Sequence, residues 1–191
     1  DGNDLICSTD HIEGNDGNDT IEGGFIAGGN GDDTVDAGDC IAGGNGDDTI
    51  SGDSINGDNG NDSIDTHDHI FGDNGEDTIF GGKISGGNGA DTIDAGDCIS
   101  GGSGNDTIAG NHISGGNGDD SIESHDHIVG NDGDDSIFGG QIEGDEGNDT
   151  IVAGDCISGG NGDDTIQGDS IDGNQGNDSI DSHDHIEGND G

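Results

Sequence analysis

The stretch Gly43-Gly44-Asn45-Gly46-Asp47-Asp48-Thr49-Ile50 decides the fold, because it returns with small changes along all 191 residues. The Asp-(Thr/Ser)-(Ile/Val) tripeptide that ends it recurs at alternating intervals of 14 and 15 residues. A short fixed period is typical of a solenoid, in which each repeat packs only on its neighbours. We therefore expect about thirteen coils of 14–15 residues, forming a single domain over 1–191 that is a fragment of a longer array.

Each repeat carries two aliphatic anchors. The first is the Ile or Val of the tripeptide, as at Ile50, and the second is an isoleucine five or six residues later, as at Ile55. Each first anchor lies nine positions after the second anchor of the preceding repeat. Since neighbours in a strand point to opposite faces, the anchors point inward. This spacing predicts two short strands per coil, joined by two unlike turns.

The composition indicates a chain that needs a cation. Asp and Glu number 46 against one basic residue, Lys83, which gives a formal net charge of −45, and only 23% of residues are hydrophobic. Such a polyanion is expected to be disordered without counterions. The charge excludes nucleic acid and anionic membranes as partners, and no apolar stretch is long enough for membrane insertion. The natural partner of so many carboxylates is a hard cation such as Ca²⁺.

The Gly43–Ile50 stretch resembles the G-G-x-G-x-D-x-U-x nonapeptide of the RTX (repeats-in-toxin) family, and the resemblance covers essentially the whole chain. It implies an all-β fold, a right-handed parallel β-solenoid (β-roll), with Ca²⁺ between stacked turns. The chain departs from the family in its return arm, which has five or six residues instead of a second nonapeptide. We therefore expect a calcium row on one edge only. The second glycine is replaced in six coils by the residues that best tolerate a left-handed backbone: Asn15, Asp58, Asp73, Asn131, Asp145 and Asn174.

The aspartate at the sixth position of each nonapeptide is the candidate calcium ligand. Coils stacked about 4.8 Å apart would place these aspartates in a column, where neighbouring turns could share roughly twelve ions. Because ion binding and folding would then be linked, we expect the chain to fold on Ca²⁺ after secretion. The candidate ligands are Asp4, Asp19, Asp33, Asp48, Asp62, Asp77, Asp91, Asp106, Asp120, Asp135, Asp149, Asp164 and Asp178.

The sequence also has a longer period of 58 residues, which corresponds to four coils. Cysteines recur at Cys40, Cys98 and Cys156, too far apart for an intrachain disulfide, and they are either interchain contacts or small exposed residues repeated by duplication. Histidines recur as pairs that either form a secondary transition-metal site or are simply exposed polar side chains: His67, His69, His125, His127, His183 and His185. Four phenylalanines fall at outward positions: Phe25, Phe71, Phe80 and Phe138.

The repetition favours a structural protein over an enzyme, because catalysis needs one site unlike the others and no catalytic dyad is recognisable. We expect a secreted, extracellular or cell-surface segment of a rigid fibre, surface layer or adhesin stalk, which associates with copies of itself. One alternative is the calcium-triggered secretion tail of an exported toxin or enzyme. Another is an ice-binding solenoid that uses the hydroxyl row from Thr20 to Ser179, although the neighbouring column contains acids such as Glu22.

Overall fold

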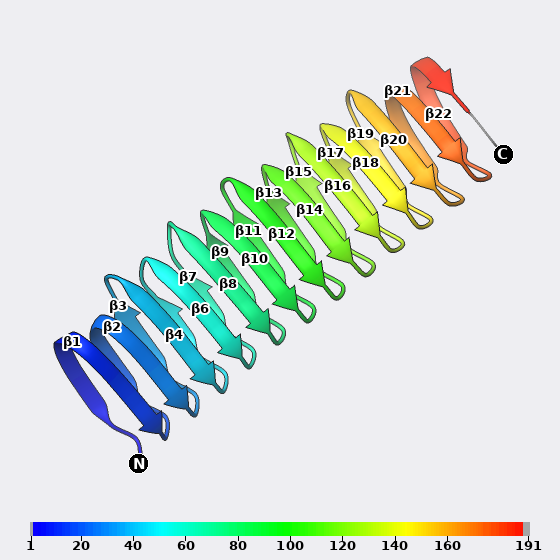
Figure 1. Cartoon of the computed structure of the whole chain (residues 1–191). Coiled ribbons are helices and arrows are strands. Elements are labelled where there is room, and N and C mark those ends of the chain that lie inside the picture. The colour runs from blue at the N-terminus through cyan, green and yellow to red at the C-terminus, as the bar shows by residue number, and fades with distance from the viewer. Residues whose placement is uncertain (1, 189–191) are drawn as a thin grey trace. The chain divides into compact units, whose positions relative to one another are not determined.

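The computed structural model describes residues 2–188, and these form twenty-two β-strands and no helix. Two compact units are present, Asp1–Gly96 (unit 1) and Asp97–Gly191 (unit 2). Each unit is a parallel β-solenoid in which the chain winds through one coil after another (Figure 1). In the described part of the chain, no helix is long and apolar enough to cross a membrane.

Eleven of the described strands lie in unit 1. Their bounds are β1 (Leu5–Asp16), β2 (Thr20–Asn30), β3 (Thr34–Ala37), β4 (Cys40–Asn45), β5 (Thr49–Ser51), β6 (Ser54–Asn59), β7 (Ser63–Asp65), β8 (His69–Asn74), β9 (Thr78–Gly81), β10 (Lys83–Asn88) and β11 (Thr92–Ala95).

The other eleven described strands lie in unit 2. Their bounds are β12 (Cys98–Ser103), β13 (Thr107–Gly110), β14 (His112–Asn117), β15 (Ser121–Ser124), β16 (His127–Asp132), β17 (Ser136–Gly139), β18 (Gln141–Glu146), β19 (Thr150–Ala153), β20 (Cys156–Asn161), β21 (Thr165–Gln175) and β22 (Ser179–Glu187).

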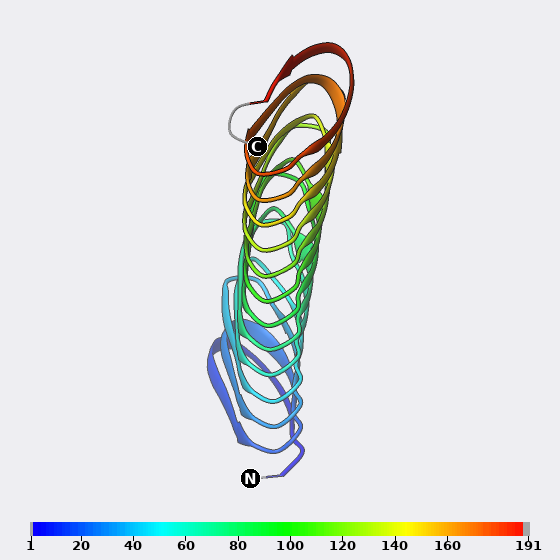
Figure 2. The same ribbon diagram turned by 90° about the vertical axis from the view of Figure 1, so that its right-hand side faces the viewer.

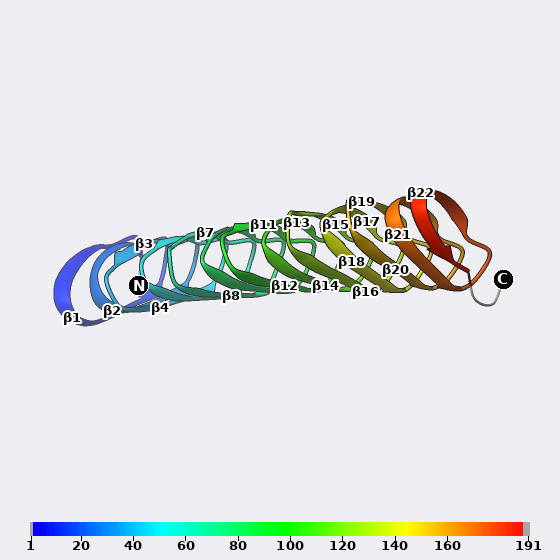
Figure 3. The ribbon, with the colours of Figure 1, turned by 90° about the horizontal axis from the view of Figure 1, so that it is seen from above.

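Each coil contributes two arms to opposite layers, which confirms the predicted pair of strands per coil. In unit 1, β3, β7 and β11 lie in one layer and β4 and β8 in the other (Figure 3). Within each unit, strands pair in parallel with their equivalents one coil later, and the anchors stay in register, as in Val35 with Ile50 and Ile41 with Ile55. Figure 2 shows the closed outline of successive coils within each unit. In β1, β2, β21 and β22 the two arms run together as one long strand through the return turn.

The core of each unit is a stack of isoleucines, as the two-anchor pattern predicts. Ile50, Ile55 and Ile64 are each 1% exposed in unit 1. The stack is incomplete at the outermost coils, where Ile6 is only half-buried and Ile186 is 50% exposed. Because the interior holds only a narrow column of aliphatic side chains, the hydrophobic contribution to stability is small for a chain of this length.

The return turns show why their lengths alternate. The six-residue turns accommodate a third inward residue, such as the buried Ala37 and Thr66. Thr66 Oγ1 donates a hydrogen bond of 2.9 Å to the Asp53 carbonyl oxygen, in the coil before its own. In the five-residue turn between them, a Cβ on Gly52 would lie 2.5 Å from both the Ala37 carbonyl oxygen and Ile41 Cδ1. The short turns therefore require glycine, whereas the long turns accept a small side chain.

The nonapeptide turns adopt the left-handed backbone that the sequence predicts. The residues that replace the second glycine all have positive φ angles, between 65° and 80°: Asn15, Asp58, Asp73, Asn131, Asp145 and Asn174. These are the only non-glycine residues with positive φ within residues 2–188. The turn geometry is therefore conserved in coils that lack the second glycine.

Candidate functional site

The sixth-position aspartates form a buried column along the nonapeptide edge of each unit. Asp4, in the first coil, is exposed, and Asp178, near the other end, is half-buried. The aspartates between them are no more than 2% exposed: Asp19, Asp33, Asp48, Asp62, Asp77, Asp91, Asp106, Asp120, Asp135, Asp149 and Asp164. A buried carboxylate is costly unless it is hydrogen-bonded and paired with a cation, so this column indicates a specific use.

Within each unit, one oxygen of a buried carboxylate accepts a hydrogen bond from the backbone of the coil before it. Asp48 Oδ1 accepts a hydrogen bond of 2.7 Å from the backbone N–H of Asp33, and Asp62 Oδ1 accepts one of 2.9 Å from that of Asp48. The same ladder occurs in unit 2, where the backbone of Asp120 donates to Asp135 over 2.8 Å. This inner ladder holds the carboxylates in one fixed orientation.

The second oxygen has no donor. Among the described residues, no hydrogen bond reaches the buried Oδ2 atoms of Asp19, Asp33, Asp48, Asp62, Asp77, Asp120, Asp135, Asp149 and Asp164. Orphaned buried acceptors are rare in proteins, and one repeated in coil after coil indicates a site that suits a positively charged partner.

In coils of both units, an Oδ2 atom and a backbone carbonyl oxygen of the following coil lie close to the same point beside the first-position glycine. A Cβ placed on Gly43 would lie 2.5 Å from Asp48 Oδ2 and 2.7 Å from the Gly57 carbonyl oxygen. In unit 2, the equivalent point on Gly159 is 3.0 Å from the Gly173 carbonyl oxygen and also contacts Asp164 Oδ2. Two acceptor oxygens close to one point suit a cation. Carboxylate and carbonyl oxygens are the ligands that calcium prefers, so the donor set fits Ca²⁺.

Burial raises the pKa values of these aspartates in the metal-free chain. The pKa is raised from 3.8 to about 7 for Asp62 and Asp135 and to about 6 for Asp48. Loss of hydration is the largest cause, and the neighbouring aspartates of the column raise the pKa further, while the backbone hydrogen bond lowers it. A proton or a cation is therefore needed to neutralise the column.

These shifts predict different pH dependences for the metal-free and calcium-bound chains. Between pH 3.8 and about 7, the folded metal-free chain binds protons that the unfolded chain does not, so its free energy of unfolding falls as pH rises through this window. Saturating calcium replaces these protons on the same oxygens, so the calcium-bound chain should lose this dependence and its free energy of unfolding should stay nearly constant over the same window. Circular dichroism of dialysed, metal-free protein at pH 5–8, with and without calcium, measures both trends.

A matched pair of variants separates this column from the general effect of protonating a polyanion. In the metal-free chain, Asp62→Asn should reduce the pH dependence of the free energy of unfolding more than Asp65→Asn does. The reason is that Asp62 is buried and Asp65, in the same coil, is exposed. Equal effects of the two variants would show that net charge alone sets the pH dependence.

A second ladder lies beside the first and runs in the opposite direction. Asp32 Oδ1 accepts a hydrogen bond of 3.1 Å from the backbone N–H of Asp47, and Asp47 Oδ1 accepts one of 2.8 Å from Asn61. The fifth-position side chain thus reaches the following coil, whereas the sixth-position side chain reaches the preceding coil. The sequence interpretation missed this ladder, although the recurrent Asp or Asn before the sixth-position aspartate is a usable signal.

Unit 1 contains a further ladder of side-chain amides at the third position of the nonapeptide. Asn45 Nδ2 donates to Asn30 Oδ1 over 2.8 Å, and Asn59 Nδ2 donates to Asn45 Oδ1 over 3.1 Å. The sequence interpretation treated this position as variable. In-register amide ladders stabilise stacked parallel strands, so this position also contributes to coil stacking.

The cysteines and histidines lie outside the aspartate column. Cys7, Cys40, Cys98 and Cys156 are free and exposed, as predicted for the last three. Of the six paired histidines, the five whose side chains are described are exposed: His67, His69, His125, His127 and His185. The side chain of His183 lies outside the described part. Within residues 2–188, no three His, Cys, Asp or Glu side chains converge as a metal-binding group. The secondary transition-metal site therefore stays a prediction.

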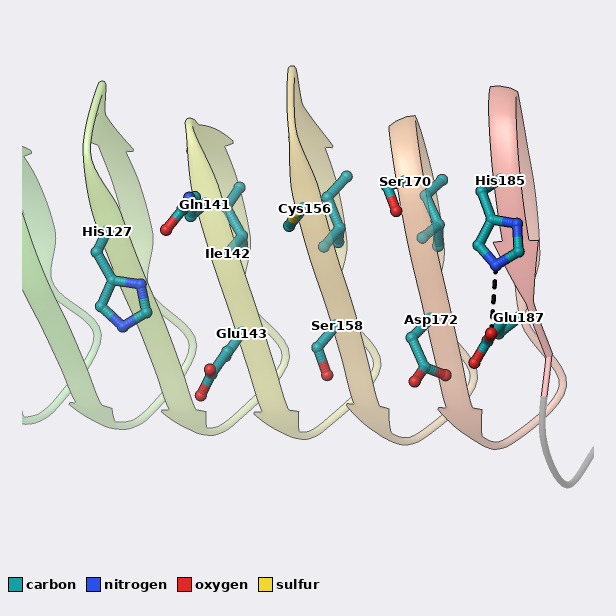
Figure 4. A pocket seen from close by; sticks show the side chains of 12 residues that line it. His127, Gln141, Ile142, Glu143, Cys156, Ser158, Ser170, Asp172, His185 and Glu187 are labelled. Carbon is teal, nitrogen blue, oxygen red and sulfur yellow. Dashed lines mark hydrogen bonds and ion pairs between the residues drawn. The ribbon is translucent and has the colours of Figure 1, made fainter.

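The outer face of unit 2 carries a shallow groove of about 390 Å³ beside one of these cysteines. His127, Gln141, Cys156, Ser170 and His185 form one row of side chains across β16, β18, β20, β21 and β22, and Glu143, Ser158, Asp172 and Glu187 form a second (Figure 4). His185 Nε2 lies 3.2 Å from Glu187 Oε1 at the last described coil. The groove is open and mixed in character, without the buried polar groups of a small-molecule site.

Comparison with known proteins agrees with the geometry of the aspartate column. The family model described as RTX calcium-binding nonapeptide repeat (4 copies) matches in overlapping segments that cover residues 8–39 and 66–184. A search of curated proteins found no match. Since the matched segments make up most of the sequence, the chain belongs to the RTX calcium-binding nonapeptide repeat family.

Proposed function

We propose that this chain is a calcium-stabilised structural segment that works outside the cell or at its surface, in a rigid fibre, a surface layer or an adhesin stalk. The observation that carries the proposal is the buried aspartate Oδ2 atom that has no donor and lies, with a carbonyl oxygen of the next coil, beside the first-position glycine. The same arrangement repeats along both units, as expected for a structural cation.

The ligands of each ion come from two successive coils. The sixth-position carboxylate, for example that of Asp48, supplies Oδ2, and the first-position glycine of the next coil, Gly57, supplies its carbonyl oxygen. Thirteen aspartates from Asp4 to Asp178 frame roughly twelve such positions, if each neighbouring pair encloses one ion. Roughly twelve divalent ions would cancel about 24 of the 45 negative charges, so the folded chain stays acidic.

A structural role follows from the uniformity of these sites. Calcium held between coils joins each coil to the next, so the ions would stiffen the solenoid throughout. Binding that requires the folded state also makes folding depend on the calcium concentration. The chain would therefore stay unfolded in calcium-poor cytosol and become ordered after export.

Electron microscopy and analytical ultracentrifugation of the protein in millimolar calcium test the structural role. We expect regular assemblies in calcium and none after chelation, because only the folded coils present regular surfaces. Chelated protein is the control for calcium-independent aggregation. Folded monomers that stay dispersed at every concentration would contradict a fibre or layer.

The calcium-triggered secretion tail is the second candidate, because a tail needs calcium-driven folding but no assembly. Dispersed monomers that fold sharply in calcium would favour this function. Both candidates share the aspartate column and neither is catalytic.

A further inference from the structure

One outer surface of unit 1 lacks carboxylates from β2 to β10, although the same rows carry Glu13 on β1. The outward side chains next to the second anchors form two rows across β2, β4, β6, β8 and β10, and both rows are exposed or half-buried. We call these rows the acid-free strip. The first row consists of Phe25, Cys40, Ser54, His69 and Lys83, and the second of Ala27, Ala42, Asn56, Phe71 and Ser85.

The composition of the strip is unusual for this chain. Since 46 of the 191 residues are acidic, about two of these ten positions would carry an acid if acids were evenly spread. Instead the strip has none, and it holds Lys83, the chain's only Lys or Arg. Phe25 and Phe71 are 51% and 53% exposed, which leaves large apolar rings in water.

Acidic residues surround the strip on the same coils. Asp58 and Asp73 lie at its nonapeptide border, and Asp53 and Asp68 lie at its return-turn border. On the opposite layer of unit 1, the exposed Asp36, Asp65 and Asp94 follow the first anchors. The acid-free strip is therefore bordered on both sides by the acidic surface typical of the rest of the unit.

We propose that the acid-free strip of unit 1 is a contact surface for a second copy of this chain, with strip packed against strip. Two copies of a polyanion repel each other most where their carboxylates meet, so they approach best through a surface that has none. This contact also buries the exposed Phe25 and Phe71 rings. The inference rests on the proposed function, because the strip exists only when the coils are folded.

The small area of the acid-free strip limits the strength of this contact. Five strands spaced about 4.8 Å apart, with rows about 7 Å apart, form a patch much smaller than the roughly 800 Å² per partner of a standard interface. We therefore expect a weak dimer that tightens with added salt, which screens the acidic borders. Unit 2 has a similar strip of six residues across β12, β14 and β16, so association could be multivalent: Cys98, Ser100, His112, Ser114, His127 and Val129.

Two substitutions on opposite layers of one coil test the proposal. Ser54 lies in the centre of the strip on β6, Ser51 lies outside it on β5, and both are exposed. Ser54→Asp and Ser51→Asp add the same charge to the same coil. Sedimentation equilibrium up to about 1 mM, in calcium and a reducing agent, should show dimers for the wild type and Ser51→Asp. We expect Ser54→Asp to weaken the dimer at least 10-fold, which is about 1.4 kcal/mol.

A second measurement on the wild type needs no substitution. Cys40 lies in the strip and Cys7, on β1, lies outside it, and both thiols are exposed. The rate of alkylation, followed by mass spectrometry, should fall for Cys40 as protein concentration rises and should stay constant for Cys7. Equal rates at all concentrations would contradict burial of the strip.

The outcomes separate this inference from the proposed function. If the chain shows calcium-induced β-structure by circular dichroism but stays monomeric to 1 mM, the proposed strip-to-strip contact is wrong and the proposed calcium site is unaffected. Equal weakening by Ser51→Asp and Ser54→Asp overturns the strip as the contact surface. A chain that fails to order in calcium overturns both proposals, and the spectrum shows this before any mass is measured.

Discussion

Removal of calcium is expected to abolish the β-structure of this chain. The narrow isoleucine column cannot hold a net charge of −45 together, since self-repulsion and chain entropy both oppose the compact state. Free calcium at about 100 times the dissociation constant stabilises the fold by about 2.7 kcal/mol per site. Summed over roughly twelve sites, this exceeds the 5–15 kcal/mol stability of an ordinary domain. The transition with calcium should therefore be steep.

Far-UV circular dichroism and isothermal titration calorimetry measure this transition. Magnesium at equal ionic strength is the matched control, because it screens charge but prefers rigid octahedral sites and gives up its water reluctantly. We expect calcium to restore the sheet signal and magnesium to restore little of it. A chain that stays equally ordered after exhaustive dialysis against a chelator would remove the basis of the proposed function.

Gly43→Ala is expected to disable one calcium position without changing any charge. The added methyl group would lie 2.5 Å from Asp48 Oδ2 and 2.7 Å from the Gly57 carbonyl oxygen, so both oxygens would have to move away from it. We expect the loss of one or two ions of roughly twelve, since neighbouring turns share ions. Amide hydrogen exchange in calcium should become faster in the coils that contain Asp48 and Gly57.

Two other glycines in unit 1 provide controls. Gly52→Ala would place its methyl group 2.5 Å from the Ala37 carbonyl oxygen and Ile41 Cδ1, so it should destabilise the fold by about 1–3 kcal/mol without loss of ions. Gly38→Ala meets nothing within 4 Å and should change stability by less than about 1 kcal/mol. If Gly52→Ala lost as many ions as Gly43→Ala, the calcium loss would reflect general destabilisation.

The architecture could be predicted from sequence because each coil repeats the same local information. The anchor spacing around Ile50 and Ile55 is compatible with two inward positions per coil, and the structure buries both. The positive φ of Asn15 and Asp58 was also predictable, because Asn and Asp are the usual substitutes for glycine there. The third inward residue of the long turns, such as Thr66, was not predicted, since it depends on the space left by Gly52 in the neighbouring coil.

The candidate site could be predicted only in part. The sixth-position aspartates were predicted from the sequence, but their burial was not. Nor was it predicted that Oδ1 accepts a backbone hydrogen bond while Oδ2 has no donor. Asp47 and Asp48 are identical neighbours in the sequence, yet one accepts a hydrogen bond from the following coil and the other from the preceding coil. The direction of a side chain depends on which backbone N–H of an adjacent coil it meets, and the sequence does not contain this information.

By itself, the sequence determined the coil, its two strands, the left-handed turns and the carboxylates available to calcium, because these depend on residue type and spacing along one chain. Only the tertiary structure decided which surfaces the side chains share. Cys40, Ser54 and His69 are 14 or 15 residues apart, and they become neighbours only when their strands stack in register. Charge repulsion acts through space, so an acid-free strip becomes visible only once the coils are stacked.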